Sequence, residues 1–187
     1  MYLARLGGRV KPAQPDVKNS QFFKYPLKVN NMSMDLGDLL ATGGVVSALK
    51  SPDKKQLLHD LSNKAAEATG LDAREIFAAL LQRERLGSTG LGSGIAIPHI
   101  KIAGLKGITC LFAKLANPIE FESHDGQTVD LVFFLLAPED AGGDHLKALA
   151  RISRLVRDPV TLERLRSAKD DKTLKRVLTE PATSHAA

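Results

Sequence analysis

The longest apolar run of the sequence, Leu131–Ala137, places the strongest constraint on the fold. It has the length of one buried strand and is far too short to be a membrane-spanning helix. It lies inside a longer apolar segment, Val129–Ala137, which follows the turn-forming pair Asp125-Gly126. Two further apolar segments, Ile95–Ile97 and Ile108–Leu115, also have strand character. The sequence therefore predicts at least three strands in its second half.

Helix signals surround these strands. We expect helices from Ser51-Pro52 to Gly70, from Asp72 to about Arg83–Arg85, from Gly142-Gly143-Asp144 with Asp144 as N-cap, from Asp158-Pro159, and from Asp170-Asp171 to about Thr179. Their inward residues are predicted to be Leu57, Leu58, Leu61, Ala65 and Ala68, then Ile76, Phe77, Leu80 and Leu81, then Leu146, Leu149, Ile152, Ser153 and Val156. With a short strand at Val45-Val46, the pattern predicts a single-domain α/β sandwich, a small β-sheet flanked by helices.

The 187 residues suffice for one well-buried domain, which we place at residues 35–180. Residues 1–34 read as a basic tail, flexible or an extension that precedes a natural start at Met32 or Met34, and residues 181–187 as a C-terminal tail. The net charge of +5 lies wholly in residues 1–34, so the rest of the chain has no overall field that draws it to nucleic acid.

A single cysteine, Cys110, excludes an intrachain disulfide and is typical of a reducing compartment, so we expect a cytoplasmic protein. The apolar neighbours of Cys110 predict a buried core thiol rather than a reactive one. No stretch of the sequence is long and apolar enough to insert into a membrane.

A glycine-rich segment between Arg83 and His99 is the main candidate for chemistry. Its small and hydroxyl-bearing residues can turn several N–H groups toward one anion, and the imidazole at its end can carry a phosphoryl group covalently. Pro98 should end the preceding strand in a stiff direction and so orient His99. The phosphate-cradle candidates are Gly87, Ser88, Thr89, Gly90, Gly92, Ser93 and Gly94. The hydroxyls could equally form hydrogen bonds with the backbone of the turn. The alternative for His99 is a capping or packing role at the end of a strand.

His145 is the second candidate, because it falls in the first turn of the helix that follows the Val129–Ala137 strand. If that strand runs beside Ile95–Ile97, both histidines meet at one sheet edge. Arg83 suits bidentate contact with phosphoryl oxygens, and Arg85 competes for that role. The alternative for each is a solvated side chain near a helix end.

Other chemistry finds less support in the sequence. The segment Gly90-x-Gly92-x-Gly94 lacks the spacing of a dinucleotide fingerprint, and the chain has no phosphate loop ending in Gly-Lys-Ser/Thr and no Gly-x-Ser-x-Gly elbow. A metal held by His99 and His145 would need a further ligand, for which Asp144 alone is thin support. We therefore expect no metal site and no cofactor.

The block from Leu86 to His99, with Arg83 before it and Asp144-His145-Leu146 after it, resembles the fructose/mannitol-type enzyme IIA family of the bacterial phosphotransferase system. Within that family it is most similar to the nitrogen-regulatory members, over about residues 36–180. The resemblance implies a mixed sheet flanked by helices and a phosphotransferase component that accepts a phosphoryl group on His99. It also implies that His145 and Arg83 help to hold the group, and that no organic cofactor takes part.

The resemblance further implies a histidine-containing phosphocarrier protein as the donor. Two outputs stay open: regulation through phosphorylation-dependent binding to targets such as kinases or transporters, or transfer to an enzyme IIB in sugar uptake. A more remote alternative is a ligand- or nucleic-acid-binding module that uses the basic tail. Ile100 departs from the family, where glycine often follows the Pro-His pair, so we expect the local backbone or the rim at which the donor docks to differ.

Overall fold

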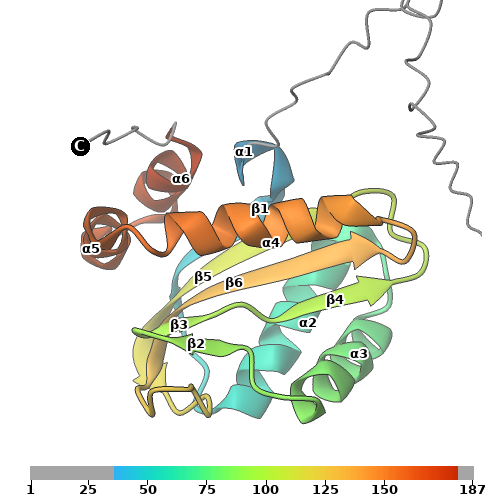
Figure 1. Cartoon of the computed structure of the whole chain (residues 1–187), viewed down its shortest axis with the longest axis horizontal. Helices are drawn as coiled ribbons and strands as arrows, with labels where there is room; N and C mark the ends of the chain where they lie inside the picture. Colours follow the sequence, from blue (N-terminus) through green and yellow to red (C-terminus); the bar gives the residue numbers. More distant parts are fainter. Residues whose placement is uncertain (1–35, 181–187) are drawn as a thin grey trace, which may run out of the picture. The chain divides into compact units, whose positions relative to one another are not determined.

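A computed structural model describes residues 36–180, which contain a six-stranded mixed sheet (Figure 1). The strands are β1 (Leu40–Leu49), β2 (Gly90–Gly92), β3 (Ile95–Ala96), β4 (His99–Ile102), β5 (Thr109–Ile119) and β6 (Val129–Pro138). Strand β6 is antiparallel to β5 and parallel to both β3 and β4; β1 is parallel to β5, and β2 is antiparallel to β3. The predicted tails, residues 1–34 and 181–187, lie outside the described residues.

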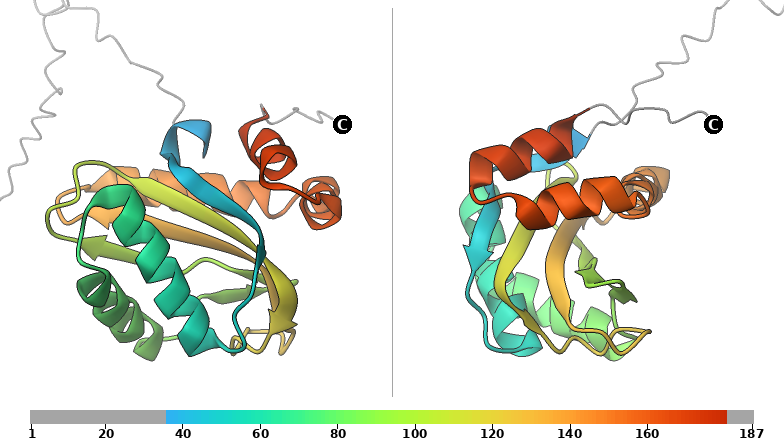
Figure 2. Two further views of the ribbon diagram at one scale, coloured as in Figure 1. Left: turned by 180° about the vertical axis from the view of Figure 1, so that it is seen from behind. Right: turned by 90° about the vertical axis from the view of Figure 1, so that its left-hand side faces the viewer.

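Helices cover both faces of the sheet (Figures 1 and 2). They are α1 (Leu36–Leu39), α2 (Lys54–Thr69), α3 (Ala73–Arg85), α4 (Gly143–Leu155), α5 (Pro159–Ser167) and α6 (Asp171–Thr179). Helices α2 and α3 pack on one face, and α1, α4, α5 and α6 contribute to the core on the other. The predicted α/β sandwich is confirmed. None of these helices is long and apolar enough to cross a lipid bilayer.

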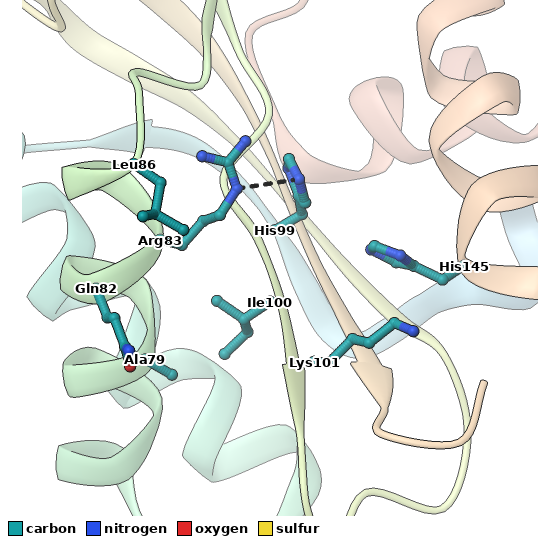
Figure 3. A pocket seen from close by; sticks show the side chains of 8 residues that line it. All are labelled: Ala79, Gln82, Arg83, Leu86, His99, Ile100, Lys101 and His145. Carbon is teal, nitrogen blue, oxygen red and sulfur yellow. Dashed lines mark hydrogen bonds between the residues drawn. The ribbon is translucent and has the colours of Figure 1, made fainter. Parts of the chain in front are cut away.

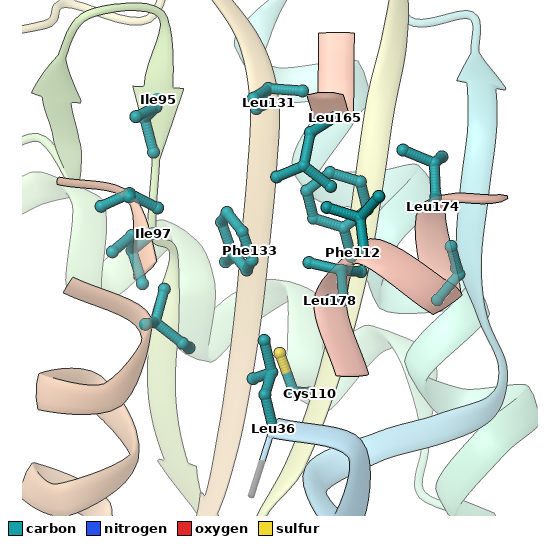
Figure 4. Close-up of a cluster of buried hydrophobic side chains, with 14 of the residues drawn as sticks. Leu36, Ile95, Ile97, Cys110, Phe112, Leu131, Phe133, Leu165, Leu174 and Leu178 are labelled. Atoms are coloured by element: carbon teal, nitrogen blue, oxygen red, sulfur yellow. The ribbon is translucent and has the colours of Figure 1, made fainter. Parts of the chain in front are cut away.

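The continuous apolar run of β6 follows from burial on both faces. Alternate side chains enter the two cores: Leu131, Phe133 and Leu135 face one cluster of buried residues, and the residues between them face the other. Figure 4 shows the first cluster, in which the rings of Phe112 and Phe133 meet edge to face at a centroid distance of 4.8 Å. Cys110 is fully buried beside them, and burial raises the pKa of its thiol to about 12. The predicted core thiol is therefore confirmed.

Most of the predicted helix ends are confirmed by their caps. The Asp72, Asp158 and Asp170 carboxylates accept hydrogen bonds from first-turn N–H groups of α3, α5 and α6. Gly70 ends α2 in the left-handed region, with φ of 76°. Helix α3 ends at Arg85, as expected.

Two predicted N-caps are wrong. Helix α2 is capped by Asp53, whose carboxylate accepts from Gln56 N at 2.8 Å, while the Ser51 hydroxyl donates to Asp60. Gly142 is the N-cap of α4, and Asp144 lies inside the first turn, where it pairs with Lys147. In each case a neighbouring residue occupies the N-cap position. Several residues that favour this position follow one another in the sequence, so the sequence alone does not indicate which of them is the cap.

Two residues predicted to face inward are exposed, Ala68 of α2 and Leu146 of α4, the latter with 66% of its surface accessible. The sequence also missed the short strands β2 and β4, which have too few residues for a period to register. We expected His99 to lie after the end of a strand, and this is wrong. Strand β3 ends at Ala96, and His99 begins a second strand beyond Pro98.

Candidate functional site

The sheet brings His99 and His145 together. Strand β4 runs parallel to β6 with His99 opposite Leu135, and Pro98 O accepts a hydrogen bond from Leu135 N at 3.0 Å. The chain leaves β6 at Pro138 and enters α4 at Gly143, which places His145 in the first helical turn. The two imidazole rings lie 5.7 Å apart between centroids, and they share one cavity (Figure 3). The predicted meeting of the two histidines at one sheet edge is thus confirmed.

The hydrogen bonds of His99 define which nitrogen carries its proton. Nδ1 lies 2.8 Å from Ile97 O, and because a carbonyl only accepts, Nδ1 must be the protonated donor. Nε2 then keeps its lone pair and accepts from Arg83 Nε at 3.3 Å. Burial lowers the pKa of His99 and the Arg83 charge lowers it further, against the hydrogen bond to Ile97 and the charge of Glu84. The neutral ring therefore turns an unprotonated Nε2 toward the cavity.

Arg83 reaches His99 from the last turn of α3. Its Nη1 donates to Gly87 O at 2.9 Å, so the guanidinium is held between the end of its own helix and the imidazole. Arg85, the competing candidate, is exposed and does not line the cavity. Of the two arginines, Arg83 therefore lies at the cavity beside His99, and Arg85 does not.

His145 presents a buried nitrogen to the site. Its Nε2 is shielded from solvent and has no hydrogen-bond partner, which is uncommon for a polar atom among the described residues. Burial lowers the pKa of His145, and repulsion by His99 when that ring is protonated, and by Lys101, lowers it further. An unsatisfied nitrogen beside a second imidazole is suited to bind an incoming polar group.

The cavity has a volume of about 370 Å³ and opens to solvent. It is lined by Ala79, Gln82, Arg83, Leu86, His99, Ile100, Lys101 and His145 (Figure 3). Lys101 was missed by the sequence reasoning because β4 was not predicted. In a strand, residues two apart share a face, so Lys101 lies on the same side as His99, while Ile100 between them is buried. Three cationic or ionisable groups thus surround His99.

The glycine-rich loop has a different place from the one predicted. None of its seven candidate residues lines the cavity. The Ser88 hydroxyl donates to Phe121 O at 2.8 Å, the Thr89 hydroxyl donates to Glu84, and Ser93 N donates to Asp125. A phosphate cradle made by this loop therefore finds no support in the geometry, and its hydroxyls satisfy the local structure instead.

The distal part of the loop serves a second region of the surface. Ser93 and Gly94 line another open cavity, of about 380 Å³, together with Asp130 and Arg166. Arg166 forms a bidentate ion pair with Asp130, at 2.7 and 2.9 Å, and also donates to Ser93 O. Gly94 has φ of +79°, and a Cβ there would lie 2.5 Å from Arg166 Nη2. These contacts fix the turn between β2 and β3.

The departure at Ile100 is accommodated without backbone strain. Ile100 is 5% exposed, pairs with Leu136 in β6 and packs with buried residues of α2 and α3. Its φ is not positive, since Ser93 and Glu122 are the non-glycine residues with positive φ within the described part of the chain. The expected change of the backbone after Pro98-His99 is therefore not required, and the side chain instead becomes part of the cavity floor.

No group of three or more His, Cys, Asp or Glu side chains within residues 36–180 is arranged to hold a metal ion. The chemistry that this cavity offers is nucleophilic: an unprotonated imidazole nitrogen, flanked by a permanent cation that donates to it and by a second imidazole. Such a set of groups can accept an electrophilic tetrahedral anion and neutralise its oxygens.

Comparison with known proteins identifies the family of the chain. The family model described as "Phosphoenolpyruvate-dependent sugar phosphotransferase system, EIIA 2" matches residues 39–180. The chain belongs to this family, and it is a phosphotransferase-system EIIA component of the second type.

Among its relatives are proteins named for nitrogen regulation. A nitrogen regulatory protein of Bradyrhizobium diazoefficiens is 53% identical over 153 residues, which cover 82% of this chain and all of the relative. The fructose-specific EIIABC component of Bacillus subtilis is 33% identical over 140 residues, 74% of this chain but 22% of that longer protein. Of these two relatives, the nitrogen regulatory protein is matched over its whole length and the EIIABC component over about a fifth of its length.

Solved structures show the same fold. The crystal structure of nitrogen regulatory protein IIA-Ntr from Neisseria meningitidis superposes with a TM-score of 0.73 at 33% identity, covering 77% of this chain and 99% of that one. IIA mannitol from Escherichia coli superposes with a TM-score of 0.62 at 19% identity, covering 72% and 95%, which shows the likeness of fold alone.

Proposed function

We propose that this chain is a phosphoryl carrier in which Nε2 of His99 accepts a phosphoryl group and the charge state of the site regulates other proteins. The observation that carries the proposal is the tautomer of His99. Ile97 O holds the proton on Nδ1, so Nε2 points its lone pair at the cavity beside Arg83. Membership of the EIIA family supplies the reaction class.

In the proposed step, the lone pair of His99 Nε2 forms a bond to phosphorus as the phosphorus–nitrogen bond of a phosphohistidine donor breaks. The electron pair of the broken bond returns to the donor ring. The proton on Nδ1 stays in its hydrogen bond to Ile97 O, which stabilises the positive charge that the His99 ring gains. Transfer of this kind has a loose transition state, so catalysis consists of positioning and neutralisation.

Three groups would perform the neutralisation. The Arg83 guanidinium, already directed at Nε2, would exchange that contact for phosphoryl oxygens. His145 Nε2 would gain the hydrogen-bond partner that it lacks, provided that it carries the proton. Lys101 would add a positive charge at the rim of the same cavity.

The donor in this proposal is a histidine-containing phosphocarrier protein, and the output is phosphorylation-dependent binding to regulatory targets. The nitrogen regulatory relatives support regulation over sugar uptake, since they match the chain across nearly their full length. Transfer onward to an enzyme IIB is the less favoured alternative. A phosphoryl group adds a charge of about −1.5 to −2 at neutral pH, enough to make or break an interface.

Reconstitution tests the assignment directly. With purified enzyme I, phosphocarrier and phosphoenolpyruvate, we expect the wild-type chain to take up one phosphoryl group and the His99→Ala variant to take up none. Stoichiometric labelling of His99→Ala would rule out the site. Binding of cell proteins to His99→Ala, compared with the charge mimic His99→Asp, then identifies targets that distinguish the two states, and an enzyme IIB as the sole partner would favour sugar uptake.

A further inference from the structure

Glu84, the residue after Arg83, forms an ion pair in the interior of the protein. Its side chain is 6% exposed, and its Oε2 lies 2.9 Å from Lys54 Nζ of α2, whose side chain is 17% exposed. Lys54 also lies over the ring of Phe121, 4.6 Å from the centroid. A carboxylate buried to this degree requires hydrogen-bond donors in fixed places.

Thr89 provides two of these donors. Its N–H donates to Glu84 Oε2 at 3.2 Å, its hydroxyl donates to Glu84 Oε1, and the residue is 4% exposed. Lys54 and Thr89 both bind the Glu84 carboxylate, and we call these three residues the Glu84 clasp. The clasp joins three separate parts of the chain: the start of α2, the end of α3 and the residue before β2.

Two connections lead from the clasp to the reacting groups. The first is covalent, because Glu84 fixes the helical turn from which Arg83 extends to His99 Nε2. The second is a series of hydrogen bonds: Thr89 O accepts from Ile97 N at 3.0 Å, and Ile97 O accepts from His99 Nδ1 at 2.8 Å. The same carboxylate is therefore connected to both the guanidinium and the imidazole.

We propose that the Glu84 clasp is a positioning element for phosphoryl transfer, which holds Arg83 and the His99 imidazole in one mutual geometry. This inference rests on the proposed function of His99. Glu84 and Thr89 do not line the cavity, so they act through Arg83 and His99 rather than on the phosphoryl group. Loss of one partner of a buried ion pair usually destabilises a protein. Lys54 keeps Glu122 as a partner when Glu84 is changed, and thermal unfolding of each variant separates positioning from folding.

The chain offers a matched control for this proposal. Glu122 accepts from the same Lys54 Nζ, at 2.8 Å, but its side chain is 80% exposed. Glu122→Gln and Glu84→Gln therefore make the same chemical change to two partners of one lysine. Thr89→Val removes the hydroxyl while it keeps nearly the same side-chain shape, and Thr89→Ser keeps the hydroxyl.

The test measures kcat and KM for transfer from the phosphorylated phosphocarrier to each variant, with thermal unfolding recorded in parallel. A misplacement of about 1 Å costs roughly 10²-fold in rate. We expect Glu84→Gln and Thr89→Val to lower kcat by roughly 10- to 100-fold while KM stays within about threefold. Glu122→Gln and Thr89→Ser should stay near the wild-type kcat. In ¹⁵N NMR spectra, the His99 ring of Glu84→Gln and Thr89→Val should lose the single-tautomer signature of the wild type.

The proposal is overturned if Glu84→Gln and Thr89→Val transfer at the wild-type rate, or if Glu122→Gln slows transfer as much as they do. It is also overturned if the loss of rate follows the fraction of unfolded protein, because the clasp is then only structural. These outcomes differ from a failure of the proposed function, in which the wild-type chain itself takes up no phosphoryl group on His99.

Discussion

Arg83→Met removes the guanidinium that donates to His99 Nε2 while it keeps most of the side-chain length. Arg85→Met is the matched control, since it makes the same change two residues away in the same helix end, at an exposed position outside the cavity. Both variants lose one positive charge. A difference between them therefore reports the location of the charge rather than the net charge of the protein.

The magnitude follows from the contact. Arg83 Nε lies 3.3 Å from His99 Nε2. The oxygens of a phosphoryl group bonded to His99 Nε2 would therefore lie close to the guanidinium. A pair of unit charges about 4 Å apart contributes roughly 4 kcal/mol at an effective dielectric constant of about 20. Loss of one donor to a developing oxyanion costs about 2.7–4 kcal/mol. At about 1.36 kcal/mol per factor of ten, the expected fall in transfer rate is roughly 10²- to 10³-fold.

Rapid-quench measurement of phosphoryl transfer from the phosphocarrier gives this rate directly. We expect the loss in Arg83→Met and no more than about a threefold change in Arg85→Met, because an exposed charge outside the cavity is largely screened by solvent and salt. Arg83→Lys should recover part of the rate, because it keeps a charge but loses the fork that also holds Gly87 O. A folded Arg83→Met that transfers within threefold of wild type, or an equal loss in Arg85→Met, would refute the reasoning.

Three further outcomes are expected. His145→Ala should slow phosphoryl uptake by roughly 10²-fold or more in the same assay, since a donor is lost, and an unchanged rate would exclude His145 from the site. Burial first, and the charge of Arg83 in addition, lowers the pKa of His99 below its ordinary 6.5, so the fall of the transfer rate in acid, as Nε2 is protonated, should be centred below pH 6.5. A fall centred above pH 6.5 would contradict this. Gly94→Ala should lower the free energy of unfolding by about 1–3 kcal/mol in a denaturant titration, because the left-handed backbone and the contact with Arg166 both oppose a Cβ, and unchanged stability would contradict this account of the turn.

The parts of the site that the sequence could predict are those with a local signal. Asp72, Asp158 and Asp170 act through hydrogen bonds to N–H groups two or three residues away, so their caps were predictable. The run at Leu131–Ala137 indicates a strand buried on both faces without reference to its neighbours. His99 and His145 were brought together by one further assumption, that two strands of the predicted set run side by side.

The parts that could not be predicted depend on contacts between distant residues. Glycine and hydroxyl residues that favour an anion cradle also satisfy an ordinary turn. Contacts with Phe121 and Asp125, which lie outside the segment, decide between the two roles. Lys101 was not predicted as a site residue because β4, with four residues, is too short to show the alternation of a strand. Strand β4 is defined by its pairing with β6, which is distant in the sequence. Leu146 has the helical spacing of the apolar face of α4, but it lies beyond the edge of the core and is exposed.

The charges around His99 determine what a regulatory target can recognise. Before phosphorylation, the cavity has the positive charges of Arg83 and Lys101, while the nearby Glu84 carboxylate is neutralised by Lys54. A phosphoryl charge of about −1.5 to −2, offset by the positive charge that the His99 ring gains, would cancel about one of the two cations, so the face becomes less positive rather than strongly negative. The exposed Leu86 lines the same cavity, and because its side chain is uncharged it gives no discrimination by itself. A target that distinguishes the two states must therefore respond to the loss of positive charge, which favours acidic partners of the unphosphorylated form.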